Sequence, residues 1–153
     1  MAHYPVNHRF RGTYRGLAAL CGLLFLVAGI VGIIVTSGGE FFSRGSHWAL
    51  GLRTNPAQAW LSVVIGVVLV AAAAIGGNVH HRVSSGGGWA LMVLGVFGLA
   101  VLQTDVNVFN FSVVNIIVLL VTGLVVLLAG LYGKVDDDPE AAERERIATA
   151  GRG

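Results

Sequence analysis

The chain has 153 residues, of which 55% are apolar and only 12% are charged, whereas soluble domains contain about 25% charged residues. Asp, Glu, Lys, Arg and His are missing from four long stretches, residues 17–35, 61–75, 89–102 and 113–132. Helices in a soluble core would need a polar face, which these stretches lack. The composition therefore excludes a soluble domain and predicts an integral membrane protein.

The four stretches predict membrane-spanning helices. A bilayer core about 30 Å thick is crossed by about 20 helical residues, and each stretch reaches that length alone or with its flanks. We expect spans at about 15–36, 57–77, 86–104 and 111–133. They would form an all-α four-helix bundle within residues 1–135, followed by a cytoplasmic tail, 136–153, that is expected to be disordered.

The basic residues predict how the chain is oriented. If the N-terminus starts in the cytoplasm, eight of the ten Lys and Arg residues lie inside and only Arg44 and Arg53 lie outside. This excess is the bias that orients membrane proteins, so both termini are expected to be cytoplasmic. Arginine far outnumbers lysine in a chain rich in Ala, Gly and Val, as is typical of GC-rich bacterial genomes. The predicted location is the bacterial plasma membrane.

Two segments outside the spans carry interfacial signals. The N-terminal residues 3–16 mix arginines with aromatic rings, which suits the lipid headgroup layer better than nucleic acid. The connection 36–60 is too apolar for a free loop and is expected to lie in the outer interface as a short helix or a re-entrant turn. At its end, Thr54 or Asn55 is expected to cap the second span, with Pro56 as its first residue.

Residues for catalysis or metal binding do not gather in the spans. The five histidines lie outside them, and the single cysteine, Cys21, has no partner for a disulfide. His80 and His81 fall in a glycine-rich link, 76–88, that is expected to be a solvated loop, and adjacent side chains point apart. We expect no metal site, no cofactor and no enzymatic activity.

A polar island, residues 103–115, separates the third and fourth spans. Asn110 or Ser112 is a natural N-cap for the fourth span, and Gln103 and Thr104 can bind the carbonyls that end the third. Capping does not explain Asp105, for which we expect an ion pair with Arg53 that ties the two outer loops together. A ligand site at Asp105 is the less favoured alternative.

Glycine spacing inside the spans predicts close helix packing. Residues 22–32 and 123–133 share the pattern G-L-x-x-L-x-A-G-x-x-G. In lipid, small residues let helix backbones approach, and van der Waals packing then holds the helices together. We expect the shared pattern to reflect one packing solution reached twice, in preference to an inverted duplication.

The stretches "LGLRTNPAQAWLSVVIG", "QTDVNVFNFSVVN" and "GLVVLLAGLYGKV" together resemble a family of small actinobacterial membrane proteins, catalogued as domain of unknown function 4383. The resemblance covers about residues 14–135. It implies four spans and no particular activity. The family pattern also has a histidine early in the second span, where this chain has Ser62.

These observations predict a structural or accessory subunit of a membrane complex, or a homo-oligomer. The alternative is a small-molecule or lipid carrier that works as an oligomer. A carrier would use the polar residues of the spans, Asn115, Thr122 and Ser62, to line a cavity, whereas a structural protein would bury them in helix–helix hydrogen bonds. The expected partners are the lipid bilayer and a membrane protein or a second copy.

Overall fold

The computed structural model describes residues 6–136 and 147. Within them the chain forms four α-helices and one two-stranded sheet. The helices are α1 (Arg11–Val35), α2 (Pro56–Ile75), α3 (Gly77–Val101) and α4 (Val113–Leu131), and the strands are β1 (His47–Ala49) and β2 (Leu52–Thr54). The all-α prediction is confirmed. Most of the tail expected at 136–153 lies outside the described residues.

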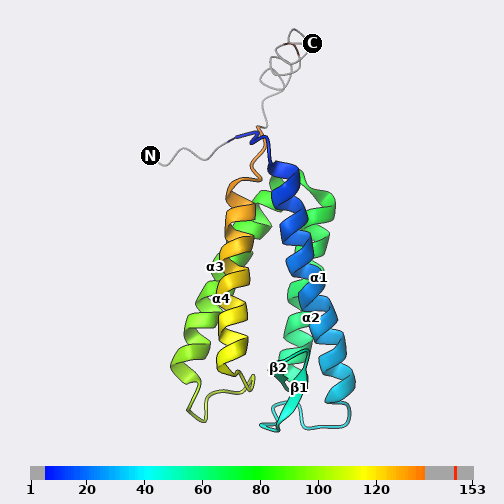
Figure 1. Ribbon diagram of the computed structural model, residues 1–153, viewed down its shortest axis with the longest axis vertical. Coiled ribbons are helices and arrows are strands. Elements are labelled where there is room, and N and C mark those ends of the chain that lie inside the picture. Colours follow the sequence, from blue (N-terminus) through cyan, green and yellow to red (C-terminus); the bar gives the residue numbers. More distant parts are fainter. Residues whose placement is uncertain (1–5, 137–146, 148–153) are drawn as a thin grey trace.

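The helices form two antiparallel pairs, α1 with α2 and α3 with α4 (Figure 1). The pairs meet along the seams α1–α4 and α2–α3, and in Figure 1 they spread apart toward the end that carries the strands. We call this end, with β1, β2 and the α3–α4 loop, the strand end. The opposite end, where both termini emerge, is the terminal end.

Glycines bring the two helices of each pair into backbone contact. A Cβ added to Gly29 of α1 would lie 2.7 Å from the backbone nitrogen of Val63 in α2. A Cβ added to Gly130 of α4 would overlap the backbone nitrogen of Ser85 in α3. The two copies of the repeated glycine pattern therefore serve the same purpose, each against its own partner helix.

The bundle is apolar both inside and outside. Its core lies between the helix pairs and contains Cys21, Phe25, Leu69, Leu91, Phe111, Ile116, Leu119 and Val126. Large apolar side chains also point outward along every helix, among them Leu24, Ile34, Val64, Val93 and Val121. Such a surface is unfavourable in water but suits hydrocarbon. All four helices are long and apolar enough to cross a bilayer, so the chain is a multi-pass membrane protein.

The link between α2 and α3 is a correction to the sequence-based prediction. Residues 76–88 were expected to form a loop, but α3 begins at Gly77 and not near residue 86. The reversal is completed by Gly76 and Gly77 alone, with φ of 74° and 54°, values that glycine adopts at little cost. Beyond this turn, Ser84 and Gly88 are buried. Packing against α4 therefore keeps this glycine-rich segment helical despite its low helix propensity.

The connection between α1 and α2 is a second correction. A short helix or re-entrant turn was expected there, but β1 and β2 pair as an antiparallel hairpin with Ala49 opposite Leu52. Leu50 and Gly51 form its two-residue turn with φ of 52° and 80°, as in a type I′ turn. Leucine rarely adopts a positive φ, so Leu50 and Gly51 are only a weak sequence signal for this turn.

The predicted starts of α2 and α4 are confirmed. Asn55 caps α2 by accepting a hydrogen bond from the backbone N–H of Gln58, with Pro56 as the first helical residue. Ser112, and not Asn110, caps α4 in a capping box with Asn115. In both cases a short polar side chain satisfies backbone donors that would otherwise lack partners at a membrane surface.

The expected orientation predicts a labelling pattern. In a Cys21→Ala background, Arg44→Cys and Val106→Cys at the strand end should react with a membrane-impermeant thiol reagent added outside intact cells. Gly12→Cys and Arg82→Cys at the terminal end should react only after the cells are opened. All four positions are exposed, so access across the membrane alone decides the result. Reaction of position 82 from outside would contradict the four-span arrangement.

Candidate functional site

Three asparagines of the polar island and the N-cap of α2 form a cluster of buried asparagines at the strand end. Asn55, Asn107, Asn110 and Asn115 are 0%, 8%, 2% and 3% exposed. We call these four residues the asparagine cluster. A buried amide must find hydrogen-bond partners, and these side chains find most of theirs in the backbone of neighbouring loops.

Asn55 connects the two outer loops while it caps α2. Its side-chain nitrogen donates to the carbonyl of Ser43 at 3.0 Å and to that of Val108 at 2.8 Å. Its side-chain oxygen accepts from the N–H of Gln58 at 2.8 Å. One buried amide therefore fixes the start of α2, the loop before β1 and the α3–α4 loop together.

Asn115 joins α4 to the strand β2. Its side-chain nitrogen donates to the Arg53 carbonyl at 2.8 Å, and its side-chain oxygen accepts from the Arg53 N–H at 3.1 Å. The same oxygen accepts from the Ser112 hydroxyl at 2.6 Å. Asn115 thus pairs with Arg53 much as a neighbouring strand would, and it holds the β-hairpin over the start of α4.

Asn107 and Asn110 hold the α3–α4 loop itself. Asn107 donates to the carbonyl of Phe111 at 2.9 Å and accepts from its N–H at 2.8 Å. Asn110, in the left-handed region with φ of 55°, donates to the Gly45 carbonyl at 2.8 Å. Asparagine tolerates this conformation better than most residues. In the polar island the chain therefore reverses direction, and hydrogen bonds connect it to the loop before β1.

The expected ion pair between Asp105 and Arg53 is wrong. Asp105 pairs with Arg44, whose Nη1 lies 2.8 Å from Oδ1 of Asp105. Arg44 also donates to the carbonyl of Thr104. Arg53 lies on β2, where Asn115 binds its backbone N–H and carbonyl. An ion pair does join the two outer loops, as predicted, but it uses the other outer arginine.

This ion pair should contribute little to stability. The Asp105 side chain is fully exposed and that of Arg44 is 46% exposed, so water and salt screen the attraction. Asp105→Ala should lower the thermal midpoint in detergent only slightly. A double-mutant cycle should couple Asp105 to Arg44 and not to Arg53. Coupling to Arg53 would contradict the assignment, as would a large loss from Asp105→Ala that persists in high salt.

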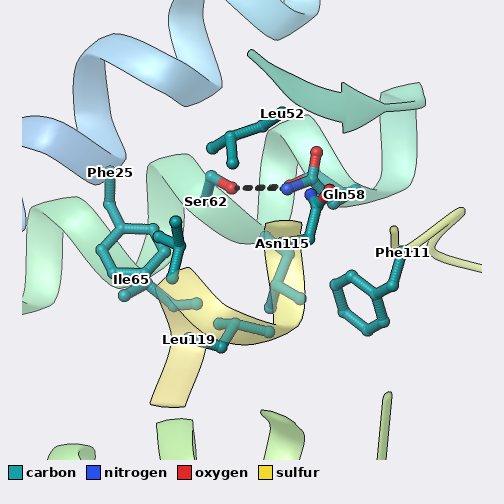
Figure 2. A pocket seen from close by; sticks show the side chains of 10 residues that line it. Phe25, Leu52, Gln58, Ser62, Ile65, Phe111, Asn115 and Leu119 are labelled. Carbon is teal, nitrogen blue, oxygen red and sulfur yellow. Dashed lines mark hydrogen bonds between the residues drawn. The ribbon is translucent and has the colours of Figure 1, made fainter. Parts of the chain in front are cut away.

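Of the other polar residues predicted to line a site, Ser62 lies near Asn115, whereas Thr122 borders a different hollow and Gln103 is exposed. Ser62 donates to the Gln58 carbonyl at 3.0 Å and accepts from the Gln58 side chain at 3.4 Å, and Figure 2 shows this pair beside Asn115. Thr122 donates to the Val118 carbonyl within its own helix. Gln103 lies exposed in the turn after α3. The Thr104 hydroxyl donates to the carbonyl of Val101 at the end of α3. Gln103 makes no such contact among the described residues.

Ser62 and Asn115 border a small cavity between the helix pairs (Figure 2). Its volume is about 20 Å³, and Phe25, Ile65, Phe111 and Leu119 form much of its wall. One water molecule needs about 10–15 Å³ measured in this way. The cavity can therefore hold a water but not an organic molecule.

The adjacent side chains of His80 and His81 contact two different partners. The His80 Nδ1 lies 3.1 Å from the Ser84 hydroxyl, and the His81 Nδ1 lies 2.7 Å from the Gly130 carbonyl. Within residues 6–136 and 147, no three His, Cys, Asp or Glu side chains gather as a metal site would require. His80 was not predicted to have a role, yet it is 2% exposed.

A comparison with protein families finds a model that covers most of the chain. The family model described as a domain of unknown function (DUF4383) matches residues 15–132. The chain belongs to this family. The match takes in α2, α3, α4, nearly all of α1 and the whole asparagine cluster. The resemblance inferred from the sequence is thereby confirmed.

For this DUF4383 member, no curated protein and no solved structure gives a match. The function must therefore be inferred from the DUF4383 domain itself. In this chain Ser62 is part of the hydrogen-bonded group around Gln58.

Proposed function

We propose that this multi-pass membrane protein is a structural or accessory subunit of a membrane complex in the bacterial plasma membrane, or that it acts as a homo-oligomer. It would work by association and would not be an enzyme. The arginine-rich composition and the excess of basic residues at the terminal end support a bacterial inner-membrane location.

The observation that carries this proposal is the internal use of the polar side chains. Ser62, Asn115 and Thr122 were the residues that a carrier would use to line a passage. Each is hydrogen-bonded within the bundle. The cavity that Ser62 and Asn115 share has a volume of about 20 Å³, which is far below the 300–1,000 Å³ of ordinary small-molecule sites. These side chains are better explained as groups that stabilise the helix bundle than as the lining of a passage.

The outward faces of the helices support association. Leu24, Val64, Val93 and Val121 are each 56–62% exposed and offer an apolar surface along all four helices. Lipid can cover such a surface, and so can the helices of another membrane protein. Most glycine contacts of the helices lie between α1 and α2 and between α3 and α4, whereas Gly16 and Gly86 have open space at Cβ. Association with a partner would therefore rely mainly on larger side chains.

Isolation from native membranes tests the proposal. The full chain, tagged at its N-terminus, is cross-linked in cells, extracted in a mild detergent and weighed as an intact particle. We expect a particle larger than one chain, containing either a second copy or another membrane protein in fixed ratio. A four-span protein of unrelated sequence, expressed at the same level, serves as the control. A single chain with lipid alone, in cross-linked and native samples alike, would contradict the proposal.

One observation favours the alternative, a lipid carrier. Two apolar hollows of about 190 and 240 Å³ lie on opposite seams, one between α1, β2 and α4 and one between α2 and α3. Thr122 borders the first. Exchange of labelled lipid between vesicles with and without the protein tests this function. Exchange that a bulky substitution such as Ala28→Phe or Ala90→Phe abolishes would favour the carrier over the structural role.

A further inference from the structure

A basic hollow opens at the terminal end, away from the asparagine cluster. Its volume is about 410 Å³. It is bordered by the start of α1, the start of α3 and the segment that follows α4, through Arg9, Arg11, Gly12, Arg15, Gly77, His80, Gly133 and Val135. Asp136 follows Val135 but is exposed and does not border the hollow.

The three arginines keep donors available for a ligand. Arg15 donates to the carbonyl of Ala74 near the end of α2 at 3.2 Å, and Arg11 donates to the Asn7 side chain at 3.2 Å. Arg9 lies 4.8 Å from the centre of the Phe10 ring. A guanidinium group has five N–H donors, so one such contact leaves most of them free. The hollow therefore concentrates positive charge and hydrogen-bond donors.

His80 supplies a second and independent signal. It is 2% exposed and borders the hollow, and its Nε2, although close to the Ala129 carbonyl, makes no hydrogen bond of good geometry within the described residues. Its Nδ1 lies 3.1 Å from the Ser84 hydroxyl. When that hydroxyl donates to Nδ1, the ring proton sits on Nε2 as a donor. A buried N–H donor that makes no good hydrogen bond destabilises the protein unless a bound ligand accepts from it.

The N-terminus of α3 adds donors to the same place. Gly76 precedes the helix and provides no side-chain cap, while Gly77 borders the hollow. The first N–H groups of a helix lack partners within it and carry the positive end of the helix dipole. Helix starts of this kind, beside basic side chains, bind phosphate groups.

We propose that this hollow binds a phosphate group, with Arg9, Arg11, Arg15 and His80 as donors and the start of α3 beneath it. The phosphate belongs either to the headgroup of an anionic lipid of the adjoining leaflet or to a soluble phosphate compound. Both present the same tetrahedral anion, which matches the planar donors of arginine. The binding does not depend on the structural role proposed above.

The full-length protein in detergent and in vesicles tests the two sources. One arm adds inorganic phosphate at constant ionic strength, with chloride as the reference. The other compares vesicles of phosphatidylcholine with vesicles containing 30% phosphatidylglycerol. In each arm the thermal midpoint and the ¹⁵N resonance of the His80 Nε2 are recorded. A response in the first arm identifies a soluble phosphate, a response in the second identifies a lipid headgroup, and either supports the proposal.

Two variants separate a defined site from general surface charge. Replacing both Arg9 and Arg11 with Gln should weaken binding at least tenfold, because two charge-assisted contacts are lost. The matched control, Arg82→Gln, removes an exposed arginine of α3 that does not border the hollow and should bind as the parent does. The proposal is overturned if neither arm moves the His80 resonance, or if Arg82→Gln weakens binding as much as the double variant.

Discussion

Replacing Gly130 with alanine is expected to unfold the α3–α4 pair or to lower its thermal midpoint in detergent by many degrees. A Cβ at this position would overlap the backbone nitrogen of Ser85 and lie 2.8 Å from the backbone carbon of Ser84. Backbone atoms cannot rotate away as a flexible side chain can, so the two helices must separate along their length. Much of the van der Waals packing that holds helices together in lipid would then be lost.

The matched control is Gly86→Ala in α3, where an added Cβ meets nothing within 4 Å. It should leave the midpoint unchanged or raise it slightly, because alanine favours helix over glycine by about 1 kcal/mol. The same contrast is expected for Gly29→Ala in α1, where Val63 and Ala59 stand in the way, against Gly16→Ala, where nothing does. Equal midpoints for Gly130→Ala and Gly86→Ala would show that α3 and α4 do not pack as described.

Replacing Asn115 with alanine is expected to be the most damaging change at the strand end. It leaves the Arg53 N–H and carbonyl without the Asn115 side chain that now pairs with them. These Arg53 groups are partly buried, so each one that loses its partner costs at most the ~1–3 kcal/mol of a fully buried group. The capping box at Ser112 is lost as well, which adds about 0.5–2 kcal/mol. Thermal melts and protease resistance of the 36–55 connection should both report the loss.

Gln103→Ala is the control for Asn115→Ala, because Gln103 belongs to the same polar stretch but is exposed. It should melt as the parent does and leave the connection resistant to protease. If Asn115→Ala behaves like Gln103→Ala, the β-hairpin is not held to α4 by this amide.

The sequence predicted what depends on composition and local chemistry. Charge-free stretches located the four helices because hydrocarbon tolerates little else. Asn55 with Pro56, and Ser112, were among the residues expected to begin two helices, because capping involves only neighbouring residues. Glycine spacing predicted tight packing, and Gly29 and Gly130 do lie at backbone contacts.

The features that were missed depend on contacts between distant segments. The glycine-rich start of α3 has the local sequence of a loop. It is helical because α4 packs against it at Ser84 and Gly88. Arg44 and Arg53 were equal candidates for Asp105, and only the path of the β-hairpin separates them. His80 is buried because its ring packs beside Gly133, which follows α4. A histidine in a polar, glycine-rich segment gives no sign of this burial in the sequence.

Thiol labelling at position 62 tests most directly whether the polar side chains of the spans are closed within the bundle. Ser62→Cys, in the Cys21→Ala background, replaces one hydroxyl that is 4% exposed with a thiol of similar shape. With a membrane-impermeant maleimide added at the strand end, Arg44→Cys should react fully while Ser62→Cys stays unlabelled until the protein is denatured. Labelling of position 62 in the folded protein, at a rate near that of position 44, would reveal a water-filled passage and contradict the structural role.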